Sequence, residues 1–199
     1  MGSTRAALGF RTHSGWAAVV AVTGTLRAPE VLDRRRIEIA DSSLPGSKQP
    51  YHAAEELPLE KAKSLLKRLE TSSARLARQA VGDVVEDLKA RGFAVVGCGL
   101  LLASGRPLPA LASVLASHAL IHTADGQHFR EALLQASERH RLRVFRVKER
   151  EVSALAAARF RIPADELQSR VNALGKGLGP PWTQDQKLAA LAGWLALAG

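Results

Sequence analysis

The sequence has little of three things that would each define a class of protein. Its 199 residues include one cysteine, Cys98, so no intrachain disulfide can form. An unpaired cysteine and an N-terminus without the apolar core of a signal peptide lead us to expect a cytoplasmic protein. Aromatic residues are 5% of the chain, which argues against a stacking platform for single strands. The longest apolar runs, Ala17–Val22 and Leu188–Ala198, fall far short of the roughly 20 residues that span a bilayer, so we expect no membrane partner.

Acidic residues are also in short supply. The chain has 28 Lys and Arg against 19 Asp and Glu, giving a formal net charge of +9 and a pI near 10.4. A balance this basic favours an anionic partner, and nucleic acid is the expected one. We predict that phosphate contacts come from these residues: Arg11, Arg34, Arg35, Arg36, Arg141, Arg143, Arg146 and Lys148. The alternative is scattered, solvated charge.

The pattern of apolar residues predicts a mixed α/β order. Three strands joined by short turns should occupy residues 6–40, followed by a long helix over Pro58–Arg91 whose Leu65, Leu69 and Leu76 face the sheet. Further strands are expected at 93–102 and 142–147, with helices at 108–122, 127–140, 151–160, 163–174 and 183–197. Asp125 and Gly126 would separate or bend the middle helices. We expect one domain over residues 1–199.

The two ends of the chain carry a resemblance to a known family. Leu8–Trp16 reads as a strand and a tight turn into a second strand, and Pro181–Lys187 opens a capped, largely apolar final helix. With the element order, these segments resemble the RNase H-like nucleases, especially the Holliday-junction resolvase (RuvC-like) branch. The resemblance implies a mixed five-stranded sheet in the order 3-2-1-4-5, with strand two antiparallel to its neighbours and helices on both sides.

The resemblance also implies clustered carboxylates that hold two divalent ions. The acid of the first strand falls on Arg11, and the acid near the fourth strand falls near Gly97–Gly99, where there is no carboxylate. The acid of the first helix could correspond to Glu55 or Glu56. Because Mg²⁺ requires oxygen ligands, this set predicts a degenerate site with no cofactor, or Mg or Mn if activity remains.

Asp185 matches an acid of the family's final helix, but it has a structural interpretation too. Three residues further on, where resolvases have a second Asp, this chain has Leu188. Thr183 and Gln186 have the spacing of a capping box around Asp185, and an acid in a first turn stabilises the helix dipole. We favour the capping interpretation over metal binding.

A second group of residues has the spacing of a metal site. His118 and His122 lie four apart, which places them on one face of a helix, and Asp125 continues the register. Zn²⁺ is the metal that such a pair would suit. The favoured alternative is a pair of hydrogen-bonded histidines near a helix end. His52 could approach the same region, but its sequence position does not decide this.

These observations lead to a nucleic-acid-binding or regulatory RNase H-like domain without two-metal catalysis. One alternative is a divergent metal-dependent nuclease that acts on structured DNA or RNA and uses Asp185, Glu55 or Glu56, and the histidines. A second is a protein-interaction module that binds no nucleic acid. A homodimer is compatible with the sequence but is not indicated by any one feature of it.

Overall fold

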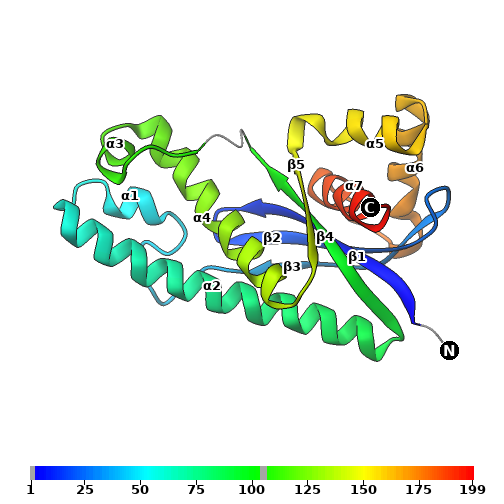
Figure 1. The fold of residues 1–199 in the computed structure, drawn as a ribbon, viewed down its shortest axis with the longest axis horizontal. Helices are drawn as coiled ribbons and strands as arrows, with labels where there is room; N and C mark the ends of the chain where they lie inside the picture. The colour runs from blue at the N-terminus through cyan, green and yellow to red at the C-terminus, as the bar shows by residue number, and fades with distance from the viewer. Residues whose placement is uncertain (1–2, 104–106) are drawn as a thin grey trace.

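A computed structural model describes residues 3–103 and 107–199. The described residues contain five strands in one sheet, and helices lie on both sides of that sheet (Figure 1). In chain order the elements are β1 (Thr4–His13), β2 (Trp16–Gly24), β3 (Pro29–Glu38), α1 (Pro50–Ala54), α2 (Leu59–Ala90), β4 (Phe93–Leu102), α3 (Leu111–Leu115), α4 (His118–Arg139), β5 (Arg143–Lys148), the 3₁₀ turn η1 (Glu149–Glu151), α5 (Val152–Phe160), α6 (Ala164–Leu174), the 3₁₀ turn η2 (Lys176–Leu178) and α7 (Gln184–Leu197).

The sheet has the order expected from the sequence. The strands lie as β3-β2-β1-β4-β5, and β2 pairs antiparallel with both of its neighbours. β4 runs parallel to β1, and β5 runs parallel to β4, so the carboxyl ends of these three strands meet at one edge of the sheet. The hairpin between β1 and β2 is tight: His13 pairs with Trp16, and Gly15 has a φ of +84° that few other residues adopt.

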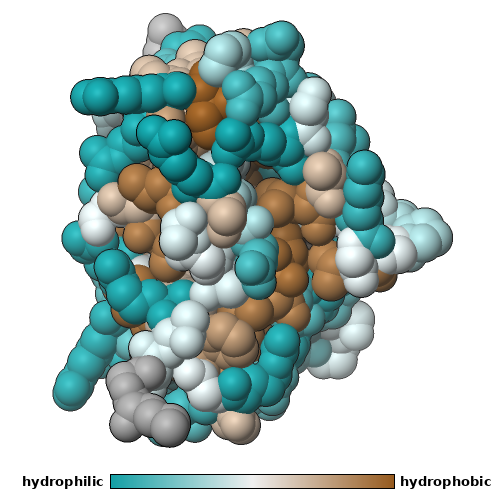
Figure 2. Space-filling view, turned by 90° about the vertical axis from the view of Figure 1, so that its right-hand side faces the viewer, coloured by the Kyte–Doolittle hydropathy of each residue, from teal (hydrophilic) through white to brown (hydrophobic). Residues whose placement is uncertain are grey.

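The helices form a layer on each face of the sheet. One core cluster joins the sheet to α2 and α4, and a second joins the opposite face to α5, α6 and α7. Helix α7 is buried almost throughout, which explains its apolar sequence on every side. On the side of the molecule where α5 and α6 lie, apolar surface is visible between hydrophilic side chains (Figure 2).

Helix α2 meets its neighbours differently from the prediction. Of the three leucines expected to face the sheet, Leu69 alone is fully buried, while Leu65 and Leu76 are half-buried. At 1.5 Å per residue α2 is about 48 Å long, against about 33 Å for a ten-residue strand, so its first half extends beyond the sheet (Figure 1). There it packs on α1 and α4, and the part that covers the sheet carries Ala77, Val81, Val84 and Leu88.

The break between the middle helices falls earlier than the sequence suggested. The helix expected over 108–122 is wrong: α3 ends at Leu115, and Ser117 is extended before α4 begins. Asp125 and Gly126 lie inside a continuous α4. The Asp125 side chain accepts hydrogen bonds from α1 instead of competing for its own backbone, so it does not interrupt the helix. Among the described residues, no helix combines the length and apolar character that crossing a bilayer requires.

Candidate functional site

Helix α7 lies directly on the sheet because glycines lie beneath it. Gly9 of β1 and Gly99 of β4 are paired neighbours. A Cβ atom at Gly9 would collide with the backbone of Ala189, and one at Gly99 would collide with the backbone of Ala192. The two glycines therefore allow a close approach of helix to sheet that no other residue would permit.

This seating brings the first turn of α7 to the end of β1. Asp185 precedes Ala189 by one helical turn, and Arg11 follows Gly9 by two residues on the same face of the strand. From the contact between Gly9 and Ala189, Asp185 lies about 6 Å away along the helix and Arg11 lies about 6.6 Å away along the strand, so the two distances match. Asp185 and Arg11 consequently meet above the sheet.

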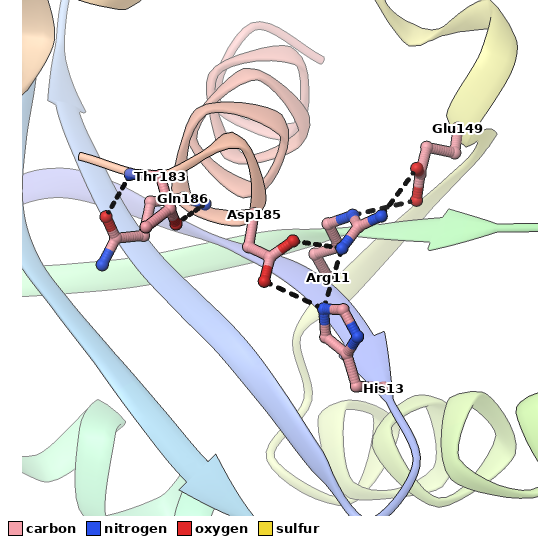
Figure 3. A network of polar contacts seen from close by, with 6 residues as sticks. All are labelled: Arg11, His13, Glu149, Thr183, Asp185 and Gln186. Carbon is pink, nitrogen blue, oxygen red and sulfur yellow. Dashed lines mark hydrogen bonds and ion pairs between the residues drawn. The ribbon is translucent and has the colours of Figure 1, made fainter. Parts of the chain in front are cut away.

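Arg11 is the centre of an ion-pair cluster of four residues (Figure 3). Its Nε and Nη2 donate to the two carboxylate oxygens of Glu149 over 3.1 and 3.0 Å, in a bidentate pair. Its Nη1 donates to Oδ1 of Asp185 and lies 2.8 Å from Nε2 of His13. All four side chains are partly buried, with Arg11 21% exposed, so these pairs are stronger than pairs fully in water.

His13 joins the cluster from the same face of β1, two residues beyond Arg11. Its Nε2 lies 3.0 Å from Oδ2 of Asp185 and also faces Nη1 of Arg11. Arginine only donates, so this nitrogen either accepts from Arg11 or, when protonated, donates to Asp185. The ring is stacked on Trp16, with centroids 4.1 Å apart and planes 8° apart, which fixes its position.

The neighbouring charges shift the pKa values of the two arginines at this site, Arg11 and Arg130. Burial acts to lower the pKa of Arg11, but hydrogen bonds and charge from Glu149, together with those from Asp185, outweigh it and raise that pKa. Burial lowers the pKa of the neighbouring Arg130; Glu149 opposes this effect and Arg11 adds to it. Nε of Arg130 is buried without a hydrogen-bond partner among the described residues.

Two surface hollows meet beside this cluster at Arg130. One, next to β4 and β5, includes Leu100, Gln127 and Arg146 in its lining together with Arg130. The other adjoins the ion-pair cluster and is lined by Ala103, Arg130, Glu149, Arg150, Gln184 and Leu188. The carboxyl edge of the parallel strands thus offers an open surface with three arginines along it.

The capping interpretation of Asp185 is confirmed in its geometry. The N–H of Gln186 donates to the Thr183 hydroxyl over 3.5 Å, and the N–H of Thr183 donates to Oε1 of Gln186 over 2.9 Å (Figure 3). Asp185 lies in the first turn that this box opens, and its carboxylate contacts Arg11 and His13. It therefore both stabilises the helix start and closes the ion-pair cluster.

The other residues predicted as catalytic lie elsewhere. Glu55 is the C-cap of α1, Glu56 follows it, and both are exposed. Within the described residues, no hydrogen bond or ion pair connects either of them to Arg11 or Asp185. β4 contributes no carboxylate, and burial raises the pKa of the Cys98 thiol to about 11, which makes it unreactive at neutral pH.

The predicted phosphate-binding residues fall on opposite edges of the sheet. Arg34, Arg35 and Arg36 lie on β3, whereas Arg143, Arg146 and Lys148 lie on β5. Four strand spacings of about 4.8 Å place these edges roughly 19 Å apart. The arginines of β3 and the basic residues of β5 therefore form two separate groups.

The arginines of β3 have partners inside the protein. Arg34 donates to backbone carbonyls of the segment before α7, including that of Leu178 at 3.2 Å. Arg35 pairs with Asp33 at 2.5 Å and Asp87 at 2.7 Å. Arg36 pairs with Glu38 at 2.5 Å and covers the ring of Trp16 at 4.0 Å.

The basic residues around β5 are less engaged. Lys148 pairs with Glu151 at 3.2 Å, and Arg143 donates to the carbonyl of Gly199. Among the described residues no acidic partner is found for Arg141, Arg143 or Arg146, and all three are exposed. Exposed arginines without an acidic partner among the described residues thus extend from the amino end of β5 to its carboxyl half.

The histidines come together in a way that the sequence only partly indicated. His118 and His122 begin α4 on one face, and His52 of α1 joins them. Asp125, expected as a ligand, instead lies behind the cluster, with Oδ2 2.5 Å from Nδ1 of His52.

Two members of the ion-pair cluster were not predicted. Glu149 follows β5 directly, and the carboxyl end of a parallel strand is where site residues gather, so its position was a usable signal. His13 shares a strand face with Arg11 by the period of two, which was also a usable signal. β1 continues to His13, which carries that side chain onto the site.

Comparisons with known proteins agree with this architecture. No protein-family model matches the chain, and no curated protein matches it in sequence. The structure of Thermus thermophilus RuvC in complex with Holliday junction substrate superposes with a TM-score of 0.54 and 12% identity, covering 96% of this chain and 90% of that one. Another Thermus thermophilus RuvC structure gives 0.52 and 11%, covering 95% and 91%.

The fold is RuvC-like. Carboxylates that hold two divalent ions are what the resemblance of the sequence implies for such a fold, and the residues of the ion-pair cluster do not fit them. Glu149 and Asp185 are the acids present, and both are paired with Arg11. A fixed guanidinium beside these oxygens repels a metal ion and occupies the lone pairs that would bind it.

Proposed function

We propose that this chain is a nucleic-acid-binding domain that contacts the phosphate backbone and does not cleave it. The observation that carries the proposal is the bidentate pair of Arg11 with Glu149, completed by Asp185. The protein's own cation stands at the position where the resemblance places the first metal-binding acid. Fold and chemistry separate readily in evolution, so a RuvC-like fold can retain binding without catalysis.

Charge supports nucleic acid as the ligand. The net charge of +9 favours an anionic partner, and a solved RuvC structure of similar fold contains Holliday junction substrate. We place the contact surface along β5, where Arg141 and Arg143 at its amino end and Arg146 nearer its carboxyl end have no acidic partner among the described residues. Arg130 lines the same hollow as Arg146 and adds a second guanidinium at that end of the surface.

Binding is tested with fluorescence anisotropy, using a labelled four-way junction and a labelled duplex at about 50 and 200 mM salt. We expect binding that weakens steeply with salt. Replacing Arg141, Arg143 and Arg146 by Gln should reduce the slope of log K against log salt by about 2.7, from about 0.9 for each phosphate contact on duplex DNA. The loss should be similar for unrelated sequences, because phosphate contacts carry no base information.

A matched variant separates this surface from net charge alone. Replacing Lys61, Lys63 and Lys67 by Gln removes the same charge from exposed positions near the start of α2. We expect this variant to bind nearly as the unmodified chain does. Equal losses in the two variants would contradict the assigned surface. No binding at the lower salt would contradict the function and favour the protein-interaction module.

Cleavage is tested separately, with the same junction and duplex and with Mg²⁺ or Mn²⁺. We expect no products above those of a metal-free reaction. Metal-dependent cleavage that Asp185→Asn abolishes would establish the divergent nuclease instead. Binding without cleavage is the outcome that supports the proposal as a whole.

A further inference from the structure

We infer that His52, His118 and His122 form a binding site for Zn²⁺ or a neighbouring first-row transition-metal ion. One ring nitrogen from each of the three histidines lies within 4.8 Å of the other two. The site lies where α1 meets the start of α4, on different elements from the ion-pair cluster, and is independent of nucleic-acid binding (Figure 1).

The spacing of the nitrogens suits a tetrahedral ion. Nε2 of His118 and Nε2 of His122 are 3.1 Å apart. Zinc–nitrogen bonds of about 2.0–2.1 Å place the nitrogens of a tetrahedral site about 3.3–3.4 Å apart. Two imidazole nitrogens this close cannot both present lone pairs unless a proton or a metal ion lies between them.

The three rings converge edge to face around one point. The His52 ring centroid is 4.5 Å from that of His122 and 5.4 Å from that of His118, with the planes at 68° and 89°. Helical spacing of four residues explains the first pair of ligands, and α1 supplies the third. The site is thus fixed by two elements that the fold holds against each other.

Asp125 has the place of an orienting group rather than a ligand. Its Oδ2 is 2.5 Å from Nδ1 of His52, and its Oδ1 accepts the N–H of Tyr51 over 2.7 Å. A carboxylate at Nδ1 favours the tautomer with the ring proton on Nδ1, which leaves the lone pair of Nε2 for a metal ion. Metal-binding histidines commonly donate their second nitrogen to a carboxylate in this way.

The burial of Asp125 strengthens the inference. The residue is 4% exposed, and an ionised carboxylate is costly to bury without a compensating positive charge. Its hydrogen-bond partners among the described residues are a backbone N–H and a histidine, neither of which carries a fixed charge. A divalent ion on the far side of the His52 ring would supply positive charge close to it.

The donor set selects the kind of metal. Three neutral imidazoles suit Zn²⁺ and its first-row neighbours, whereas Mg²⁺ and Ca²⁺ take oxygen ligands. His118 and His122 are exposed, so a fourth coordination position would face solvent and could hold water. Bound there, the ion would tie α1 to α4 and fix the chain between β3 and α2.

The test is a calorimetric titration of the metal-stripped chain, without a histidine tag, with Zn²⁺. We expect one equivalent to bind. Co²⁺ should give the intense visible absorption of a tetrahedral site. His118→Ala and His122→Ala should each lower the affinity at least a hundredfold, and His52→Ala should do the same. Asp125→Asn, which retains an acceptor for Tyr51, should lower it about 10- to 100-fold.

Two controls keep the outcome decisive. His140→Gln removes a histidine from the far end of α4 and should leave zinc binding unchanged. Circular dichroism and thermal unfolding without metal should show that His118→Ala and His122→Ala fold normally, since both positions are exposed. No stoichiometric binding, or binding that these two variants leave intact, would overturn the site. A hydrogen-bonded histidine cluster would then be the correct description.

Discussion

The ion-pair cluster around Arg11 and the histidine cluster around His122 differ in the source of their positive charge. In the first, two carboxylates surround a guanidinium that is part of the chain. In the second, three imidazoles surround a point to which no lysine or arginine of the described residues is bonded, and a buried carboxylate lies behind them. The first is electrostatically complete, and the second is complete only with an ion.

The two clusters thus balance charge in different ways within one fold. In the ion-pair cluster, the guanidinium of Arg11 lies between the carboxylates of Glu149 and Asp185 and supplies the positive charge. The two acids depend on Arg11, because partly buried carboxylates repel each other once its charge is removed. The histidine cluster depends instead on what lies between its rings, because the facing nitrogens of His118 and His122 need a proton or a metal ion between them.

The largest effect is expected from reversing the charge at the centre of the first cluster. Arg11→Asp would place three carboxylates together and should lower the free energy of unfolding by about 3 kcal/mol, near the lower end for breaking a buried pair. Because three carboxylates suit Mn²⁺ or Mg²⁺, the variant should also gain a metal dependence that the unmodified chain lacks. At ten times its Kd, the ion should restore about 1.4 kcal/mol.

Thermal unfolding with and without Mn²⁺ measures this gain. For a chain of this size we expect the metal to raise the Tm of the variant by about 3–5 °C. Arg11→Asn is the matched control, because it removes the cation without adding a ligand of comparable charge. A Tm rise of equal size in both variants, or in neither, would contradict the idea that Arg11 stands in for a metal ion.

A smaller effect should follow when each cluster loses one member without charge reversal. Arg11→Met should lower the free energy of unfolding by about 2 kcal/mol, because two partly buried carboxylates lose their partner and the pair is only partly desolvated. His122→Ala in metal-free buffer should cost less than about 0.5 kcal/mol, as exposed positions usually do. Urea unfolding followed by circular dichroism measures both values. Equal costs would contradict the contrast between the two clusters.

Much of the fold was predictable because its signals are local. The apolar runs at β2 and β4, the hairpin turn and the capping box of α7 each leave a short pattern, and the strand order followed from the resemblance. The break before α4 was missed because Ser117 carries no strong stop signal, whereas Asp125 and Gly126 do. Asp125 remains helical through a contact with α1, and no local pattern reveals such a contact.

The sites were predictable only in part, for the same reason. Arg11 and Asp185 came from the two ends of the chain, and the pair His118 and His122 came from helical spacing. Glu149 and His52 lie far from these residues in sequence and are brought in by the seating of β5 and α1. Residues that complete a site across elements depend on the whole fold, which short-range patterns do not encode.

The smallest effect concerns His128, which shares α4 with the exposed histidines but lies in a different environment. Burial lowers the pKa of His128, partly offset by Asp125 and Glu70, and its Nε2 lies 3.0 Å from the hydroxyl of Ser73. Below about pH 6.5, the ordinary pKa of a histidine, His128 takes up a proton in the unfolded chain more readily than in the folded chain. The free energy of unfolding should therefore fall as the pH drops from about 6.5 to the lowered pKa. Above about pH 6.5, the protonation of His128 should not affect it.

The measurement is urea unfolding between pH 5 and 8, with chelator present so that metal binding does not contribute. His128→Gln has no ring to protonate, so the difference in stability between the unmodified chain and the variant should shrink as the pH falls below about 6.5. The other histidines are common to both proteins and cancel in this difference. A difference that is constant across the range, or one that grows on acidification, would show that His128 is not held neutral by its burial.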